Sequence, residues 1–169
     1  MRILFISRYL PFPGGRENFM FELTKELSKE HEVALITPDG LLSEGFKVYK
    51  YKDDYKEIKR IIEDFKPDVI NSHTFYLCDH AQKVAKENNI PFAFTIHGNQ
   101  FVIGDEQRQN LVRKVSEKSD LVITVSEDGN RSIQNNTQAK NIETIYNGVD
   151  TVKFAKDELA KERNLLRKV

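Results

Sequence analysis

Short apolar runs alternate along the chain with longer stretches in which apolar residues recur every three or four positions. The runs predict buried β-strands, and the recurring pattern predicts helices with one apolar face. We expect strands at residues 2–6, 32–37, 46–51, 92–96, 121–125 and 142–146, and a short strand that opens at residues 69–70. We expect helices at residues 17–29, 55–65, 75–88, 105–118, 127–135 and 156–167.

The order of these elements indicates the fold class. Strands that alternate with helices of about 10–15 residues form βαβ units, and such units build a parallel sheet. Right-handed crossovers then place helices on both faces of the sheet. The sequence therefore predicts an α/β fold with an open, doubly wound parallel sheet. Within the helix at 105–118, we expect Leu111 and Val115 to face the core.

The end of the chain differs in composition from the rest. Residues 151–169 carry six basic and three acidic side chains, and they offer few apolar groups to bury. We therefore place one domain at residues 1–150 and treat residues 151–169 as a charged linker or docking helix outside the main core. A solvated terminal helix fits this composition equally well.

Composition narrows the classes of function. A chain of 169 residues suits about one domain. Basic and acidic residues number 26 each, whereas nucleic-acid binders usually carry a basic excess. No apolar run approaches the roughly 18 residues that cross a bilayer, and the four apolar residues after Arg2 are too few for a signal peptide. The single cysteine, Cys78, excludes an internal disulfide, and we expect it buried in a helix.

The first candidate site follows the first strand. In an open parallel sheet, ligands bind at the carboxyl ends of the strands. Gly14 and Gly15 precede a helix there, so the backbone can approach a ligand closely and the helix offers free N–H groups to a phosphate. The segment matches neither a Walker A loop nor a GxGxxG fingerprint, and an ordinary strand-to-helix turn is the alternative.

Two histidines follow later strands. His73 comes after the fourth strand, and His97 with Gly98 comes after the fifth, so both fall on the ligand-binding edge. Each is either functional or a structural histidine with its hydrogen bonds made within the fold. No Asp or Cys stands beside them at metal-ligand spacing, so we expect no zinc site. Ser126 suits the N-cap of a helix, and it lacks the Gly-x-Ser-x-Gly surroundings of a hydrolase nucleophile.

Five segments, taken in order and with their spacing, resemble the N-terminal half of retaining glycosyltransferases of the GT-B fold, family 4. They are the glycine-rich loop at 13–17, the strand end at 67–73, Thr95–Gly98, the strand at 119–126, and Ile145–Asp150 followed by Phe154. The Asn147-Gly148-Val149-Asp150 segment is the most specific of these. The resemblance covers residues 1 to about 154.

The resemblance implies a Rossmann-like domain that forms one half of a GT-B fold. In that family the N-terminal half mainly binds the acceptor, and the C-terminal half binds the nucleotide-sugar donor. We therefore expect a retaining, hexosyltransferase-type enzyme that is inactive without a C-terminal donor-binding domain in cis or in trans. The implied partners are a nucleotide-sugar donor and a sugar or lipid-linked acceptor. The resemblance implies no metal and no cofactor.

Residue roles also follow from the resemblance. His97 would be the catalytic residue and hydrogen-bond the transferred sugar. The substrate or phosphate groups would meet Gly14, Gly15, Arg16, Glu17, His73, Gly98, Ser126 and Asn147. Two positions depart from the family pattern: Asn71 replaces a usual histidine, and Arg16 stands where a small or apolar residue is common. With Arg8, Arg16 would make the first loop basic and suit an anionic acceptor, whereas a solvated arginine is the alternative.

Two other functions stay open at the level of sequence. A nucleotide-sugar epimerase uses the same two-domain architecture, although no catalytic carboxylates are identifiable here. A binding or regulatory module would keep the fold without catalysis. For all three functions we expect a cytoplasmic protein, with a peripheral attachment to the membrane left open, and no nucleic-acid partner.

Overall fold

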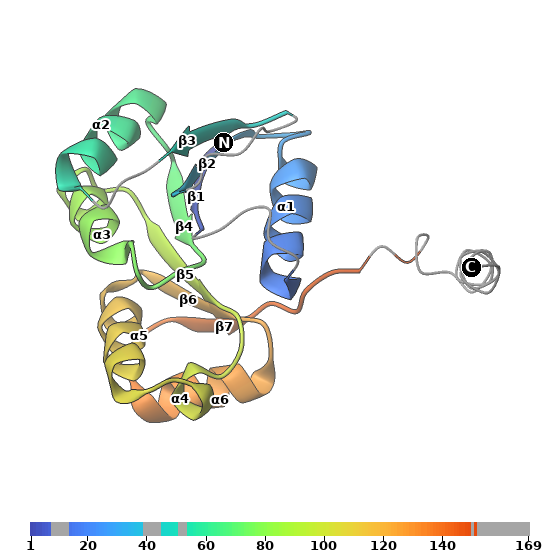
Figure 1. Cartoon of the computed structure of the whole chain (residues 1–169), viewed down its shortest axis with the longest axis vertical. Helices are drawn as coiled ribbons and strands as arrows, with labels where there is room; N and C mark the ends of the chain where they lie inside the picture. Colours follow the sequence, from blue (N-terminus) through green and yellow to red (C-terminus); the bar gives the residue numbers. More distant parts are fainter. Residues whose placement is uncertain (8–13, 39–44, 51–53, 150, 152–169) are drawn as a thin grey trace.

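The computed structural model describes residues 1–7, 14–38, 45–50, 54–149 and 151. Seven parallel strands form one sheet in the order β3-β2-β1-β4-β5-β6-β7 (Figure 1). The strands are β1 (Arg2–Ile6), β2 (Glu32–Thr37), β3 (Lys47–Lys50), β4 (Val69–Ser72), β5 (Phe92–Ile96), β6 (Leu121–Thr124) and β7 (Ile142–Thr144). The predicted α/β fold with a doubly wound parallel sheet is confirmed.

Six helices are present in the described part of the chain. They are α1 (Gly15–Leu27), α2 (Tyr55–Phe65), α3 (Cys78–Glu87), α4 (Gln100–Ile103), α5 (Glu106–Lys118) and α6 (Glu127–Asn136). The short α4 was not predicted. The predicted helix at 156–167 lies outside the described residues, as does nearly all of the segment 151–169. No helix of the described ranges is long and apolar enough to cross a membrane.

The sheet has β1 near its middle, where the strand order reverses direction. Ile3 of β1 pairs with Val33 of β2 on one side and with Val69 of β4 on the other. Helices α2, α3 and α5 cover one face of the sheet, whereas α1 lies against the other (Figure 1). All strands are parallel, so their carboxyl ends share one edge, and the segments that leave this edge can meet there.

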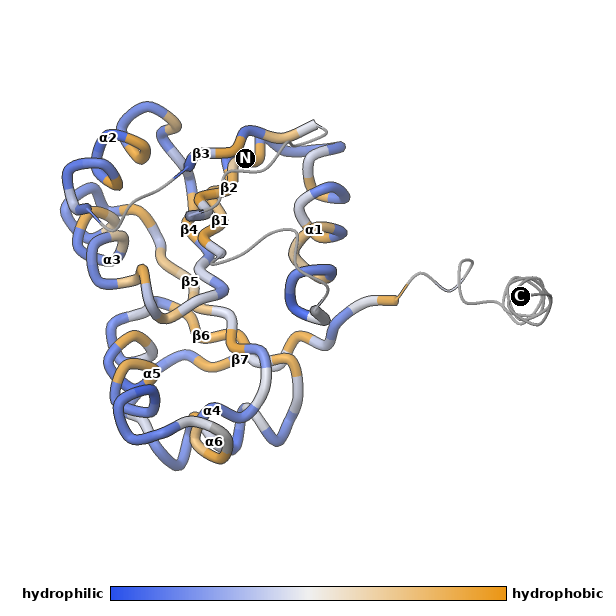
Figure 2. The backbone as a smooth tube through the Cα atoms, in the orientation of Figure 1, coloured by the Kyte–Doolittle hydropathy of each residue, from blue (hydrophilic) through white to orange (hydrophobic). Residues whose placement is uncertain are grey.

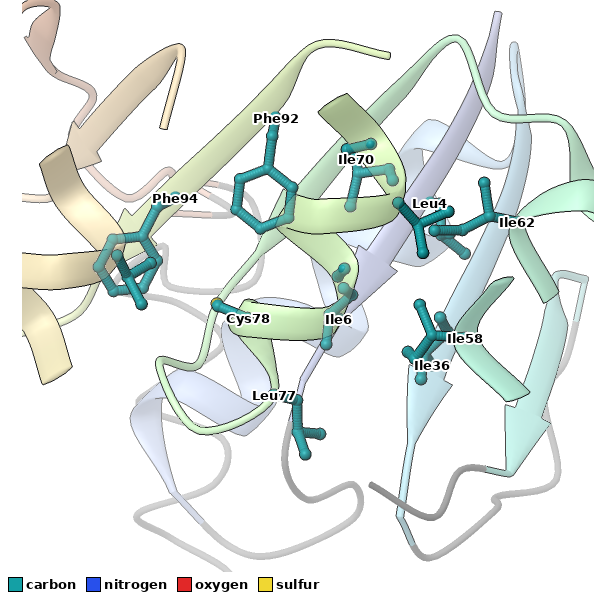
Figure 3. Packing of buried hydrophobic residues seen from close by; sticks show 14 of the residues in the cluster. Leu4, Ile6, Ile36, Ile58, Ile62, Ile70, Leu77, Cys78, Phe92 and Phe94 are labelled. Atoms are coloured by element: carbon teal, nitrogen blue, oxygen red, sulfur yellow. The ribbon is translucent and has the colours of Figure 1, made fainter. Parts of the chain in front are cut away.

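The larger part of the core lies between the sheet and α2, α3 and α5. Figure 3 shows side chains of the strands, such as Phe94 and Ile70, packed against Ile62 of α2 and Cys78 of α3. The Cys78 side chain is fully buried, as predicted. Hydrophobic residues dominate the central strands, whereas hydrophilic and hydrophobic residues alternate along the helices (Figure 2). The buried apolar residues of α2, α3 and α5 belong to this core.

Local signals in the sequence explain why α2 begins and ends where it does. The Asp54 side chain accepts a hydrogen bond from the Lys56 amide at 2.8 Å, which caps the helix N-terminus. Lys66 ends the helix in a left-handed conformation with φ of 51°, and Pro67 follows. Between these signals the apolar residues recur with the period of a helix, so the predicted range of residues 55–65 is confirmed.

A smaller cluster lies on the opposite face, beneath α1. It joins Phe5 of β1 and Leu35 of β2 to Met20 of α1. The core prediction for α5 is half right: Val115 is buried as expected, together with Val112 and Ser116, whereas Leu111 is only half-buried. The buried stripe of α5 therefore runs through positions 112, 115 and 116, and position 111 lies beside it.

Candidate functional site

The two predicted histidines meet at the carboxyl edge of the sheet. β4 and β5 are neighbours, and His73 and His97 directly follow them. Nδ1 of His73 lies 2.8 Å from Nε2 of His97, which is hydrogen-bond distance. His73 is only 3% exposed, whereas His97 is half-buried. The structure thus joins two residues that the sequence placed separately on one edge.

Aromatic rings fix the orientation of this pair from the α1 side. Phe19 of α1 packs edge-on against His97, with 5.3 Å between ring centroids, and it also contacts His73 at 6.1 Å. Phe5 of β1 packs edge-on against His73 at 5.7 Å. The two phenylalanines were not among the candidate residues, and their apolar pattern alone could not separate them from ordinary core.

Burial keeps both imidazoles neutral at physiological pH. Desolvation lowers the pKa of His73 well below its ordinary value, and the nearby His97 and Arg16 lower it further. Desolvation, with Arg16 assisting and Glu17 opposing, lowers the pKa of His97 to about 4. Each ring then carries one N–H and one free lone pair, so one proton is shared along the contact between them.

The start of α1 places a charged pair beside the histidines. Arg16 Nε donates to Glu17 Oε1 at 3.0 Å, and the Glu17 side chain is only 12% exposed. The Glu17 carboxyl group folds back over Gly14, where a Cβ atom would clash with its oxygen. Gly15 faces open space. A side chain at position 14 would therefore require the Glu17 carboxylate to move, while the backbone at position 15 stays accessible.

Gly98 and Asn99 carry the chain from β5 into α4. Gly98 has φ of +88°, a conformation that favours glycine. The Asn99 side chain accepts from Ser132 Oγ at 2.7 Å and donates to Asp128 Oδ2 at 3.2 Å, so it ties this turn to α6. Asn99 and Ser132 were missed by sequence analysis, because polar residues of this kind are common in turns and on helix surfaces.

Three other residues singled out by the sequence have no hydrogen bond to the histidine pair in the described part of the chain. Ser126 Oγ accepts from the Gly129 amide at 3.1 Å, so it caps α6 as the sequence predicted. Asn71, which stands where the family usually has a histidine, accepts a hydrogen bond at Oδ1 from Thr95 Oγ1 at 2.9 Å and so has a structural partner. Asn147 is exposed beyond β7, and no hydrogen bond in the described part of the chain links it to the histidines. Arg8, Pro13, Asp150 and Phe154 lie outside the described residues.

Comparison with protein families decides the class of this domain. Residues 13–153 match the model of Glycosyltransferase Family 4. The chain belongs to glycosyltransferase family 4. Among curated proteins, none matches this family 4 domain. The predicted resemblance to the N-terminal half of a GT-B enzyme is confirmed by the family and by the fold of solved structures.

Three solved structures illustrate the likeness of fold. HepE of Anabaena, solved in complex with UDP and glucose, is 17% identical with a TM-score of 0.74, over 98% of this chain and 50% of HepE. A glycosyltransferase of Rickettsia africae is 16% identical with a TM-score of 0.71, over 98% and 49% of the two chains. Sucrose-phosphate synthase of Thermosynechococcus elongatus is 14% identical with a TM-score of 0.68, over 89% and 49%. The family 4 domain thus spans about half the length of these proteins.

The geometry of the site limits its chemistry. A neutral imidazole with one unengaged nitrogen can exchange a single hydrogen bond with a ligand at the sheet edge. The α1 N-terminus offers free amides, and Arg16 offers a cation held in place by Glu17. Among the described residues, no three His, Cys, Asp or Glu side chains are grouped to hold a metal ion. The arrangement suits the binding and orientation of a hydroxylated or phosphorylated ligand.

Proposed function

We propose that this domain is the acceptor-binding half of a retaining glycosyltransferase. It would move a hexosyl group from a nucleotide sugar to an acceptor, together with a C-terminal donor-binding domain supplied in cis or in trans. The observation that carries the proposal is the His97 imidazole. Its Nδ1 has no hydrogen-bond partner among the described residues and is not enclosed, while the rest of the ring is fixed.

His97 would act by orienting the transferred sugar. A neutral ring that Phe19 and His73 already hold in place needs little reorientation before it forms a hydrogen bond with a sugar oxygen in the transition state. The low pKa of His97 also keeps it from competing as a cation with Arg16 for a phosphate.

The glycine-rich start of α1 would bind phosphate. Amides near Gly14 and Gly15 offer hydrogen bonds to the diphosphate of the donor or to a phosphorylated acceptor. Arg16 would add a positive charge that suits an anionic acceptor. Structures of HepE with UDP-glucose support a nucleotide sugar as the donor class.

The proposed transfer exchanges one bond at the anomeric carbon of the donor sugar for another. The bond between the anomeric carbon and the leaving phosphate oxygen breaks, and the acceptor oxygen forms a bond to the same carbon on the same face. The leaving phosphate takes the acceptor proton, so the anomeric configuration is retained. His97 neither gains nor loses a proton in this step.

Calorimetric titration of the purified chain with UDP- and GDP-sugars tests the half-enzyme proposal. We expect weak binding and no transfer, because these 169 residues span about half the length of the solved structures that they resemble and match the proposed acceptor-binding half. Recovery of transfer after a donor-binding domain is supplied would support the proposal. Tight, saturable binding with turnover by the chain alone would refute it, and a lasting lack of transfer with any such domain would favour a non-catalytic module.

Titration with inorganic pyrophosphate, followed by amide NMR, tests the phosphate role. We expect the amide signals of Gly14 and Gly15 to move in a saturable way, and Arg16→Gln to weaken the binding. Arg60→Gln is the matched control, because Arg60 is an exposed arginine on α2, across the sheet from α1. Equal binding by both variants would remove Arg16 from the site.

A further inference from the structure

We infer that His73 is a positioning residue: it donates its Nδ1–H to Nε2 of His97, which leaves His97 with a proton on Nδ1 and a hydrogen-bond donor toward the ligand. The contact itself is given by the structure, and its polarity is the inference. The inference rests on the proposed function only for the identity of the group that His97 meets.

The geometry of the pair allows two polarities. The distance of 2.8 Å between His73 Nδ1 and His97 Nε2 holds one proton when both rings are neutral. In the first arrangement His73 donates, its Nε2 is a bare acceptor, and His97 carries Nδ1–H. In the second arrangement His97 donates, His73 carries Nε2–H, and His97 Nδ1 is a bare acceptor.

The far side of His73 favours the first arrangement. Nε2 of His73 is fully buried and has no hydrogen-bond partner among the described residues. The second arrangement would therefore bury an N–H group without an acceptor. Buried N–H groups without a partner are rarer in proteins than acceptors that are only partly satisfied. The first arrangement leaves only a lone pair unpaired, and it places the other N–H of the pair where a ligand can reach it.

The surroundings keep the pair from gaining a second proton. Charged groups face it from α1 alone among the described elements, as the pair formed by Arg16 and Glu17. Phe19 and Phe5 present apolar rings to the remaining sides. Phe19 contacts both histidine rings and helps to hold the contact between His73 Nδ1 and His97 Nε2 in place. Packing therefore supports which nitrogens face one another, and the burial of His73 Nε2 decides which of them carries the proton.

The consequence is a requirement on the ligand. With Nδ1–H outward, His97 can only donate, so the ligand atom that faces it must be an acceptor. Oxygens of a sugar hydroxyl or of a phosphoryl group meet this requirement, whereas an ammonium or amide N–H group does not. The buried His73 therefore selects the chemistry at His97 without touching the ligand.

Nitrogen-15 NMR of the complete chain at neutral pH tests this polarity. We expect the proton between the rings to show its one-bond coupling to His73 Nδ1, and we expect His97 to be protonated at Nδ1. A one-bond coupling to His97 Nε2 would overturn the inference. The signals of His31 and His80 report on folding in the same spectra, since both residues lie outside the site.

Two variants separate positioning from simple packing. The amide nitrogen of His73→Asn stands at the same bond count from Cβ as Nδ1, so it can still donate to His97 Nε2. The amide nitrogen of His73→Gln stands at the position of Nε2 and cannot. We expect the asparagine variant to keep His97 protonated at Nδ1 and the glutamine variant to populate the second tautomer.

A merely structural role for His73 predicts a different result. In that case both variants would leave the tautomer of His97 unchanged while both folded, and this outcome would refute the inference. None of these measurements uses sugar transfer. A failure of the proposed function would therefore leave the result on the histidine pair standing, and the converse also holds.

Discussion

Gly98 connects His97 to the turn before α4, and its replacement by alanine probes the backbone of the site. Its φ of +88° lies in a region that L-residues rarely adopt. A methyl group added there would meet no close neighbour, because the nearest atom is Gln100 Nε2 at 4.0 Å. The cost of Gly98→Ala is therefore conformational and includes no steric clash.

Two opposing effects set the size of this cost. A left-handed backbone costs an L-residue roughly 1–2 kcal/mol. Replacing glycine also restricts the unfolded chain, which stabilises the protein by about 0.4–1 kcal/mol. The difference between the two effects is about 0–1.6 kcal/mol, so we expect Gly98→Ala to lower the free energy of unfolding by a central value of about 0.8 kcal/mol. For a chain of this length that corresponds to a fall in Tm of roughly 2–3 °C.

Urea denaturation followed by circular dichroism measures the effect. Gly15→Ala is the matched control, because Gly15 also has space for a methyl group but sits at the first position of α1 without a positive φ. We expect Gly15→Ala to be neutral or slightly stabilising, with equal m-values in both variants. If Gly98→Ala proves as stable as Gly15→Ala, the strain argument is wrong.

Four further outcomes are expected. In an assembled two-domain enzyme, His97→Ala should lower kcat far more than it weakens donor binding. If it removes a transition-state hydrogen bond, the transition state should lose about 2.7–4 kcal/mol of stabilisation. An unchanged kcat would make His97 structural. Ser126→Ala removes the cap of α6 and should cost about 1 kcal/mol in urea denaturation, whereas Ser126→Asp should restore most of it; equal stability of the two variants would contradict the cap. Folding lowers the pKa values of His73 and His97, so the unfolded chain binds more protons than the folded one below pH 6.5. The free energy of unfolding should therefore fall as pH drops from 6.5 toward 4, and a series of urea titrations should show a shallower fall for His97→Asn. An equal fall in the variant would refute the lowered pKa of His97. Burial raises the pKa of the Cys78 thiol to about 12, so a thiol reagent should label it only after unfolding, and rapid labelling of the folded chain would show that it is accessible.

The fold followed from the sequence wherever the pattern was long and its ends were marked. Helix α2 was predicted to its last residue, because its apolar residues recur over three turns and Asp54 and Pro67 bracket it. Helix α4 spans only Gln100–Ile103, which is too short to show a period.

The error in α5 has a different cause. Leu111 and Val115 are four residues apart, and Val112 and Val115 are three apart, so two stripes fit a helix equally well. The buried Ser116 continues the true stripe but is polar. Only packing against neighbouring helices decided between the two.

The sequence predicted where the site lies on the sheet, but it did not predict the hydrogen bond between the two histidines. Parallel strands bring His73 and His97 to one edge by topology alone, and adjacent strands bring them close. Their hydrogen bond depends on the rotamers of both rings and on Phe19, which arrives from another helix. Sequence spacing carries no information about these angles, and the same is true of the Asn99 link to α6.

The central place of β1 has a consequence for how the chain folds during synthesis. β1 can pair with β2 once residue 37 has emerged, but its other edge waits for β4, which ends at Ser72. At the usual 5–20 residues per second, these 35 residues take roughly 2–7 s. During that interval a nascent chain carries an apolar strand with one unpaired edge, which favours aggregation. Ribosome-bound chains that stop before Val69 should therefore be held by chaperones, and chains that extend past Ser72 should be released from them.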